Sequence, residues 1–442
     1  MNALIQIADS TADSQTVRSR DFSPEAILEA MRLGVVPRID LSAFTVGRDA
    51  QMRLVDDDLH RTQLLGGATR TFLGGYGTGK THLLECIANR AIERGFVVSR
   101  AVLDPEETAP SHPKRVYREL VRSVEYPDCP GGRGRGLRPL FERALGSKEA
   151  RDGFLVDGST RSRDTLDDGA HLYLTPALRY FRALSADPSL GPEERRRALG
   201  LLFDWLEGHP TISNTEIDRA LPRLVGRKGR IYSMMDYRPW ARIYGYLLSG
   251  LSALVRRAGY RGLVVLVDEA EFYSLLGTQN RDYARTLFKA LAWASLGADS
   301  GQLPFERTAL DRGGLGILKE LPPQYAPDAG LYTVFAMTPN SAGVDALSQA
   351  VPAHTIDEID TLTGADYRTL AGRVCAHYRR AKPDTAITDH HEAALGDATA
   401  RLARHGYVEN PRQAMKFVVE VLDIVRFRPD AVEMVIEEIG SF

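Results

Sequence analysis

Apolar residues follow two patterns along the chain, one typical of buried strands and one typical of amphipathic helices. Apolar runs at residues 70–73, 96–103, 262–267 and 331–337 are typical of strands in a buried parallel sheet, and the run at 96–103 is rich in β-branched valines. Elsewhere apolar residues recur every three or four positions, as in amphipathic helices. The pattern therefore predicts an α/β fold with a parallel sheet.

The helical period covers most of the remaining chain. We expect a short helix at Pro24–Leu33, a polar helix at about 51–64, and further helices at about 81–94, 113–124, 173–186, 192–207, 214–221, 238–258, 279–296, 363–381, 388–404, 411–424 and 429–438. Residues 127–165 are rich in Gly, Arg, Asp and Pro and predict an irregular loop. Residues 297–330 are rich in Gly and Pro, which indicates a connection between a helix and the next strand.

The spacing of the strands predicts the domain organisation. More than a hundred residues separate the second strand from the third, whereas a minimal crossover needs about a dozen. We therefore expect a mostly helical insertion at 127–240 within a core at 41–350. Residues 1–40 form an N-terminal extension, and residues 351–442 form a helical lid.

A phosphate-binding motif follows the first strand. Residues 74–81 read Gly-Gly-Tyr-Gly-Thr-Gly-Lys-Thr, a complete G-x-x-x-x-G-K-[ST] loop between a strand and a helix. Its glycines let backbone N–H groups turn toward the β-phosphate, and the helix N-terminus adds partial positive charge. We expect Lys80 to reach the β- and γ-phosphates and Thr81 to bind Mg²⁺. The predicted nucleotide-binding residues are Gly74, Gly75, Tyr76, Gly77, Thr78, Gly79, Lys80, Thr81, His82 and Arg48.

Two acids end the apolar run at 262–267. Because ligands of open α/β sheets lie at the carboxyl ends of the strands, Asp268 is the candidate for holding Mg²⁺ through water. Glu269 is then the candidate for polarising the attacking water, which favours a hydrolase over a simple kinase. The alternative to a catalytic role is that these acids are solvated side chains at the end of the strand. This alternative is credible for Glu271 and poor for the pair Asp268 and Glu269.

A helix start near the C-terminus carries another candidate. Pro411 lies where helix starts favour proline, and Arg412 follows on the first turn. From there its guanidinium could reach a γ-phosphate. The alternative is a surface arginine in a helical bundle.

Composition and charge narrow the function classes. Cys86, Cys129 and Cys375 are far apart and lack a C-x-x-C spacing, so neither a disulfide framework nor a zinc site is indicated. No apolar stretch approaches the roughly 20 residues of a membrane span, and we expect a soluble, cytoplasmic protein. The net charge of −2 argues against a globally basic nucleic-acid binder.

Any DNA contact must therefore come from a local patch. The best candidates lie in one basic stretch: Arg223, Arg227, Lys228 and Arg230, with Arg219 and the Arg133-Gly134-Arg135 segment as additions. Such a cluster suits phosphate neutralisation and not base reading. A solvated basic face balanced by Glu216, Asp218 and Asp236 is an equal alternative.

These motifs together resemble AAA+ ATPases of the replication-initiator-like branch. The phosphate loop, Asp268-Glu269, the polar strand end at Thr338 and Asn340, and Arg412 have the order of Walker A, Walker B, sensor 1 and sensor 2. The resemblance implies that the catalytic residues are Glu269, Lys80, Thr338, Asn340 and Arg412.

Four blocks resemble a narrower group, the BREX-associated ATP-binding proteins of the BrxC/BrxD group. They are residues 26–37, the phosphate loop, residues 260–271 and residues 334–339, within a similarity from about residue 22 onward. The resemblance implies an ATPase in anti-phage defence, forming a homo-oligomer beside DNA-processing partners such as a superfamily-2 helicase.

The chain also departs from these families. Residues 341–360 contain no Arg or Lys, although many AAA+ proteins place an arginine finger there. Arg307 and Arg312 are the candidate substitutes. We also expect no C-terminal winged-helix DNA reader.

Other nucleotide-binding classes fit less well. A GTPase would need N-K-x-D, which is absent, and a superfamily-2 helicase would need an arginine-rich motif downstream of Asp268 and not upstream. The main rival to an ATPase is a nucleotide-gated scaffold, or a replication or repair loader, that hydrolyses little ATP by itself.

Overall fold

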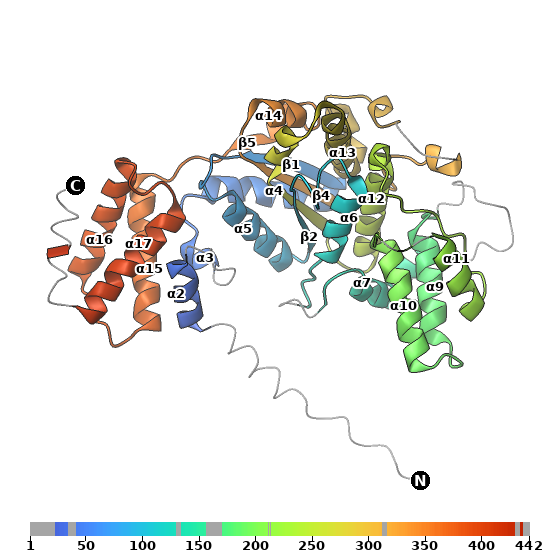
Figure 1. The fold of residues 1–442 in the computed structure, drawn as a ribbon, viewed down its shortest axis with the longest axis horizontal. Helices are drawn as coiled ribbons and strands as arrows, with labels where there is room; N and C mark the ends of the chain where they lie inside the picture. Colours follow the sequence, from blue (N-terminus) through green and yellow to red (C-terminus); the bar gives the residue numbers. More distant parts are fainter. Residues whose placement is uncertain are drawn as a thin grey trace, which may run out of the picture. The chain divides into compact units, whose positions relative to one another are not determined.

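The sheet is parallel, and the order of its strands in space differs from their order in the chain. The computed structural model describes residues 23–33, 41–129, 134–155, 170–210, 212, 214–311, 316–428 and 434–435. Within these ranges the strands are β1 (Gly67–Leu73), β2 (Val97–Val102), β3 (Leu263–Asp268), β4 (Leu331–Met337) and β5 (Ile356–Glu358), ordered β2-β3-β4-β1-β5 (Figure 1). The predicted α/β class with a parallel sheet is confirmed. The short β5 lies outside the predicted strands.

The pairing of β1, β4 and β3 aligns their carboxyl ends. Leu73 lies opposite Met337, and Val267 lies opposite Phe335. The Gly74 N–H continues the ladder by donating to the Met337 carbonyl at 3.1 Å. After β1 the chain runs toward β2, whereas after β4 it runs toward β5, the opposite side of the sheet. Strand ends where the chain direction diverges are the usual ligand position of open α/β sheets.

The described chain divides into two compact units. One holds the sheet and comprises residues 52–75 and 87–359, and the other comprises the chain up to Gln51, Tyr76–Cys86 and the chain from Asp360. The chain passes from one unit to the other within two helices, α4 (Asp49–Leu65) and α5 (Lys80–Glu93).

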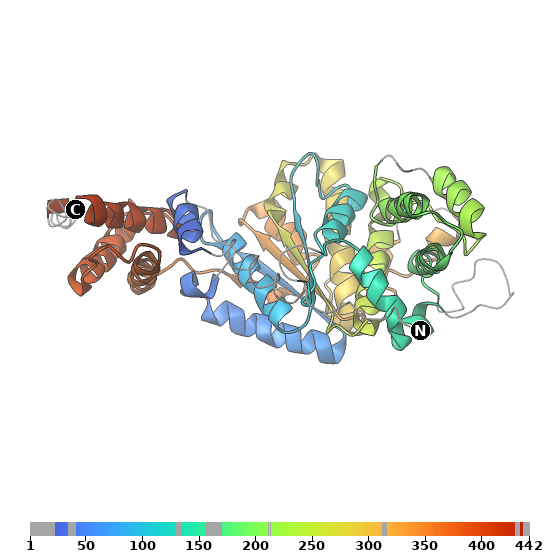
Figure 2. The same ribbon diagram turned by 90° about the horizontal axis from the view of Figure 1, so that it is seen from below.

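Helices cover the sheet of the larger unit. α12 (Ala241–Arg257) contacts β3, and α13 (Thr278–Leu296) contacts β1 and β4, as Figure 2 also shows. α6 (Pro113–Arg122) contacts β2 and α12. Shorter elements complete this unit: η2 (Arg238–Trp240), η3 (Ala270–Leu275), η4 (Gly297–Gln302), η5 (Arg307–Leu310), η6 (Gly316–Lys319), α14 (Ser341–Ser348) and η7 (Ala353–Thr355).

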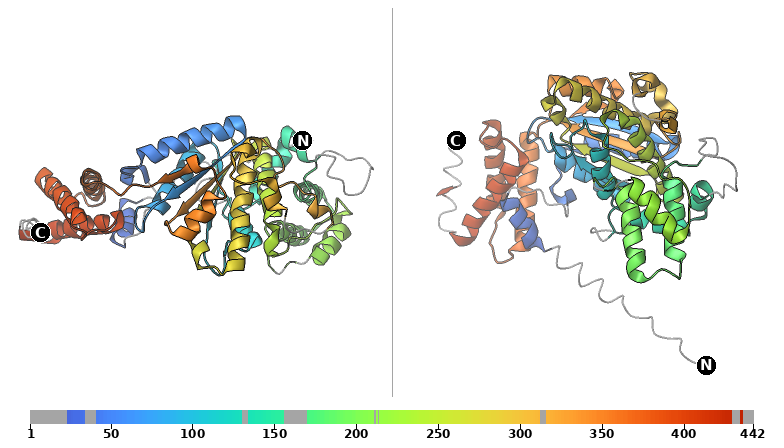
Figure 3. Two further views of the ribbon diagram at one scale, coloured as in Figure 1. Left: turned by 90° about the horizontal axis from the view of Figure 1, so that it is seen from above. Right: turned by 45° about the vertical axis from the view of Figure 1, so that its right-hand side comes forward.

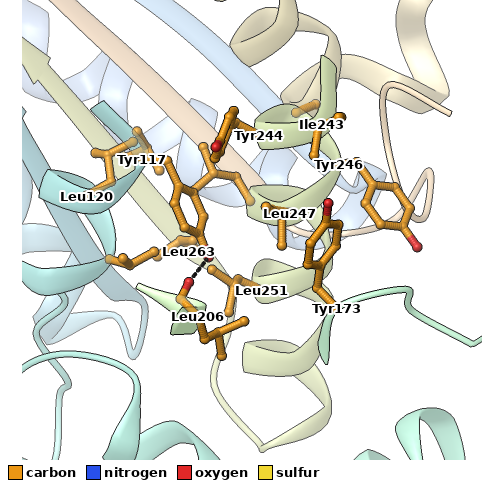
Figure 4. Packing of buried hydrophobic residues seen from close by; sticks show 14 of the residues in the cluster. Tyr117, Leu120, Tyr173, Leu206, Ile243, Tyr244, Tyr246, Leu247, Leu251 and Leu263 are labelled. Carbon is orange, nitrogen blue, oxygen red and sulfur yellow. Dashed lines mark hydrogen bonds between the residues drawn. The ribbon is translucent and has the colours of Figure 1, made fainter. Parts of the chain in front are cut away.

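In the described part of the chain, five α-helices lie between α6 and α12. They are α7 (Arg138–Gly146), α8 (Lys148–Phe154), α9 (Leu174–Ala186), α10 (Pro192–Leu206) and α11 (Asn214–Val225). In Figure 3 the green helices α9, α10 and α11 pack side by side as a small bundle. Their apolar faces join one core with α12, in which Tyr117, Leu206 and Leu251 are almost fully buried (Figure 4).

The predicted irregular loop at 127–165 is wrong where α7 and α8 form. Leu140, Phe141 and Ala144 are buried in the core on one face of α7, and Ser147 caps α8 by accepting from the Ala150 N–H at 3.2 Å. The Gly/Arg-rich composition obscured this short amphipathic period. Tertiary packing outweighs that local composition.

The smaller unit is a helical bundle. α15 (Gly364–Ala381), α16 (Asp389–Arg404) and α17 (Pro411–Phe427) pack together, and α2 (Pro24–Arg32) lies against α15 and α17. Arg32 binds Asp423 through two hydrogen bonds of 2.9 and 2.6 Å. The short helix α3 (Leu41–Phe44) contacts α15. Apart from residues 434–435, the predicted helix at 429–438 lies outside the described residues.

A buried ion-pair network fixes the sheet of the larger unit. The Arg70 guanidinium on β1 binds Asp58 of α4 and Asp357 of β5, and Tyr332 of β4 donates to Asp58 at 2.9 Å. The Arg70 and Asp58 side chains are only 8% and 9% exposed. Burial alone lowers the pKa of Arg70, but the hydrogen bond and charge of Asp58 outweigh it and raise that pKa above its ordinary value.

Asp58→Asn should destabilise the larger unit by about 3–5 kcal/mol, because it leaves the Arg70 charge buried and only partly paired. Asp299→Asn is the matched control, since it removes one carboxylate from a half-exposed pair with Arg61 and should cost less than about 1 kcal/mol. Denaturant unfolding of the two variants measures both values. Equal losses would show that the Arg70 network is not a main stabilising contact.

Candidate functional site

The phosphate-loop sequence adopts a backbone that requires glycine at two positions. Gly77 and Gly79 have φ of +79° and +93°, in the left-handed region that other residues rarely adopt. A Cβ at Gly77 would also lie 2.7 Å from the Cβ of Asn410. The Leu83 N–H donates to the Gly79 carbonyl at 2.8 Å, which starts α5 at the end of the loop. The loop is therefore specified by both conformation and packing.

The side chains predicted to bind phosphate and Mg²⁺ lie at the start of α5. Lys80 is its first residue and is 8% exposed, whereas Thr81 is exposed to solvent. Tyr76, at the tip of the loop, is 90% exposed. The loop thus combines a nearly buried lysine with an accessible hydroxyl, which suits an anionic ligand with a hard cation.

Arg48 binds the backbone of the phosphate loop and of two neighbouring segments. Its buried guanidinium donates to the carbonyls of Thr78, Gly47 and Asp360 at 2.5, 2.9 and 3.1 Å. Burial lowers the pKa of Arg48, and the charges of Asp366 and Asp360 oppose that shift. The structure therefore places Arg48 as a positioning residue that fixes the carbonyl of a loop residue.

His82 belongs to a small polar cluster beneath the loop. Its Nε2 lies 2.9 Å from the Thr45 hydroxyl oxygen and 3.6 Å from the Cys86 sulfur. The Thr45 hydroxyl itself donates to the Leu41 carbonyl at 2.7 Å, so Nε2–H of a neutral His82 is the donor to Thr45. Burial, with the charge of Arg48 adding to it, lowers the pKa of His82 to about 4.

The first turn of α17 packs against the loop in the same unit. Asn410 is 9% exposed, contacts Gly77, and caps α17 by accepting from the Gln413 N–H at 3.1 Å. Arg412 lies two residues further on and is exposed. Arg412 was predicted from the sequence and Asn410 was not, although the position of Asn410 before Pro411 is a recognisable helix-cap signal.

In the other unit, Asp268 is the last residue of β3 and Glu269 follows it, at the carboxyl edge of the sheet. Asp268 is 6% exposed and accepts from the Glu269 N–H at 2.9 Å. Glu269 has φ 59° and ψ 35°, and among the described residues it is the one non-glycine with positive φ. Such backbone costs about 1–3 kcal/mol and concentrates at functional sites. Glu271, which the sequence suggested is solvated, has one carboxylate oxygen buried without a hydrogen-bond partner among the described residues.

The polar end of β4 lies beside the end of β1. Thr338 follows Met337, the residue paired with Leu73, and is partly buried. The Asn340 side-chain oxygen caps α14 by accepting from the Gly343 N–H at 2.8 Å. Any contact of Asn340 with a nucleotide would therefore come from its amide nitrogen.

The basic cluster proposed for DNA is partly engaged within the protein. Arg227 lies 3.5 Å from Asp218 in an exposed ion pair, and the guanidinium of Arg230 lies 5.0 Å over the Tyr232 ring. DNA binding at this cluster stays a prediction. Arg307, one predicted arginine-finger substitute, is exposed on η5, whereas Arg312 and Arg133 lie outside the described residues.

The fold and these residues together define a class of protein. A parallel α/β sheet whose first strand leads into a glycine-dependent phosphate loop has a P-loop-like core. Residues 20–153 match the family model described as "BREX system ATP-binding protein BrxC/D". The predicted resemblance to that group is thus confirmed over those residues. A comparison with curated proteins returns no match.

The described helices include none long and apolar enough to cross a membrane.

The half-buried His82 generates a pH prediction. Its pKa is about 4 in the folded state and about 6.5 in the unfolded chain, so the unfolded state binds more protons between these values. Stability is therefore complete above pH 6.5 and falls as the pH is lowered. At pH 5 the loss should be about 2 kcal/mol.

Denaturant unfolding at pH 7.5 and pH 5 checks this prediction, with His82→Gln as the comparison. The variant should lose less stability than the wild type on acidification, by about the same 2 kcal/mol. An identical pH dependence of the two proteins would contradict a half-buried, neutral His82.

Proposed function

We propose that this protein is an ATPase of the AAA+ type that binds ATP with Mg²⁺. The observation that carries the proposal is the alignment of the carboxyl ends of β1, β4 and β3. A glycine-dependent phosphate loop follows β1, Thr338 follows β4, and Asp268-Glu269 lies at the end of β3. The match to BREX ATP-binding proteins over residues 20–153 supports the nucleotide and its adenine base.

Each residue of the proposed site has a distinct task. The N–H groups of Gly77, Thr78 and Gly79 would hold the phosphates, and Lys80 would neutralise them without a proton transfer. The hard oxygens of Thr81 and Asp268 fit Mg²⁺, which would supply charge neutralisation on the phosphates. Glu269 would orient the attacking water and accept its proton, and its left-handed backbone fixes the direction of that carboxylate.

Arg412 would couple the nucleotide to the helical bundle. Asn410 already contacts the loop at Gly77, so a guanidinium two residues later is well placed to read the γ-phosphate. A contact that Arg412 makes with ATP and not with ADP would shift the conformational equilibrium of the helical bundle toward the state that makes this contact. We propose that this change drives homo-oligomer formation and assembly with DNA-processing partners, such as a superfamily-2 helicase, in BREX-like anti-phage defence.

A second candidate is a nucleotide-gated scaffold or a loader that hydrolyses little ATP by itself. The absence of Arg and Lys from residues 341–360 favours it, because α14 then supplies no arginine finger to a neighbouring subunit. The two candidates differ in turnover and not in ATP binding.

Glu269→Gln should keep ATP binding and reduce hydrolysis by roughly 10²–10⁴-fold, because it keeps the shape of the side chain but removes the base. Lys80→Ala should instead weaken ATP binding itself. Phosphate release and ATP titration measure the two effects. Wild-type turnover in the Glu269→Gln protein would exclude Glu269 as the base.

Arg412→Ala should weaken ATP binding or ATP-dependent assembly by roughly tenfold while leaving ADP binding within about twofold. The reason is that only ATP carries the group that Arg412 would contact. Lys416→Ala, an exposed position one turn later on α17, is the control and should change neither. Equal losses for ATP and ADP in the Arg412 variant would point to a structural role.

A further inference from the structure

The larger unit contains a cavity that is separate from the nucleotide-binding residues. It has a volume of about 970 Å³ and is lined by α6, the end of α10, residues 208–210 and residues 233–236. This volume is at the upper end of the range for small-molecule sites. None of the residues assigned to ATP lines it, so it is not part of the proposed ATPase site.

A row of cations forms one wall of the cavity. Lys114, Arg118 and Arg122 are four residues apart on α6, so they share one face and follow each other at about 6 Å along the helix. Lys114 is only 8% exposed. The opposite, apolar face of α6 is fixed in the core by Tyr117 and Leu120, as Figure 4 shows.

In the described part of the chain no carboxylate lies within ion-pair distance of these three cations, although Glu207 and Asp236 interact with them at longer range. The side chains of Arg118 and Arg122 make no hydrogen bond among the described residues, and the Lys114 ammonium donates a single long one of 3.5 Å to the His209 carbonyl. Arg242, which is equally buried, is by contrast paired with Asp311 and bound to two carbonyls. Burying an unpaired cation is costly. Burial accordingly lowers the pKa of Lys114, a shift that a bound anion would reverse.

The described acids around the cavity form no ion pair with this row. Asp236 binds Arg115 and His112, each at 2.9 Å. Glu107 and Glu119 also line the cavity, but neither lies within ion-pair distance of the three cations. The row of Lys114, Arg118 and Arg122 therefore forms no ion pair among the described residues, and the nearby charges of Glu207 and Asp236 offset its positive charge only in part.

The other walls are held rigidly by buried aromatic side chains. Each donates a hydrogen bond to the backbone of a wall segment: Tyr117 to Leu206 at 3.1 Å, Trp205 to Tyr232 at 3.0 Å, Tyr173 to Ser233 at 3.1 Å, and Tyr244 to Met235 at 2.9 Å. The Tyr117–Leu206 bond is drawn in Figure 4. A cavity with such fixed walls is pre-organised for a ligand.

We propose that this cavity binds the phosphates of a single-stranded nucleic acid along Lys114, Arg118 and Arg122. Three cations in line extend over about 12 Å of helix, which suits successive phosphates better than one anion. Met235 lines the same cavity and is 51% exposed, so it offers a polarizable apolar surface to a base. Phosphate contacts of this kind give affinity without sequence specificity.

The test measures binding of a fluorescent oligodeoxythymidylate to the full chain as salt is varied, with the phosphate loop saturated by a non-hydrolysable ATP analogue and Mg²⁺. The double variant Arg118→Gln/Arg122→Gln should weaken binding by roughly tenfold. Its salt slope should fall by about 1.4, because each lost single-strand contact removes about 0.7. Lys114→Met should weaken binding further.

Arg196→Gln/Arg197→Gln is the matched control, since it removes two positive charges from exposed side chains of α10 that do not line the cavity. It should bind within about twofold of the wild type. Inorganic polyphosphate should compete less well per phosphate than the oligonucleotide, and equal competition would overturn a nucleic acid as the ligand because phosphate alone would then be recognised. The proposal is overturned if the wild type does not bind, or if the Arg118/Arg122 variant loses no more affinity than the control. Unchanged circular dichroism and ATP affinity in each variant exclude misfolding.

Discussion

The parallel register of β1, β4 and β3 is the constraint on which the proposed chemistry depends. The pairs Leu73–Met337 and Val267–Phe335 bring three strand ends to one edge, although they are far apart in sequence. The buried Arg70 network ties α4, β4 and β5 to β1 and so protects this register. A slip of one residue would turn every side chain of a strand to the other face and move Asp268 away from its neighbours.

The phosphate loop is held in place by three side chains to which we assign no contact with the nucleotide. Arg48 fixes the Thr78 carbonyl, Asn410 packs on Gly77, and neutral His82 fills the space below with Thr45. These contacts explain how a glycine-rich segment can keep one conformation, since glycine by itself is the most flexible residue. They also tie the loop to Asp360 and α17 within one unit, which provides a physical route from nucleotide to bundle.

Most of the fold and the phosphate loop could be predicted because their signals are local. Strong apolar runs predicted four of the strands, and caps such as Pro411 predicted helix starts. α7 and α8 were missed because Gly and Arg residues around 131–136 dominate the local composition, although Leu140 and Phe141 supply a buried face. The support of the loop by Arg48 and Asn410, and the unpaired row on α6, depend on residues brought together only by folding.

The central claim is that the loop and the acids after β3 serve one ATP molecule and hydrolyse it. The most direct measurement is phosphate release from ATP by the purified chain as Mg²⁺ is titrated, with and without a chelator. Our account predicts turnover that appears with Mg²⁺, disappears with the chelator, and is strongly reduced in an Asp268→Asn protein that still binds ATP. Phosphate release no faster than in buffer at every Mg²⁺ concentration, or release that is unchanged in the Asp268→Asn protein, would contradict it.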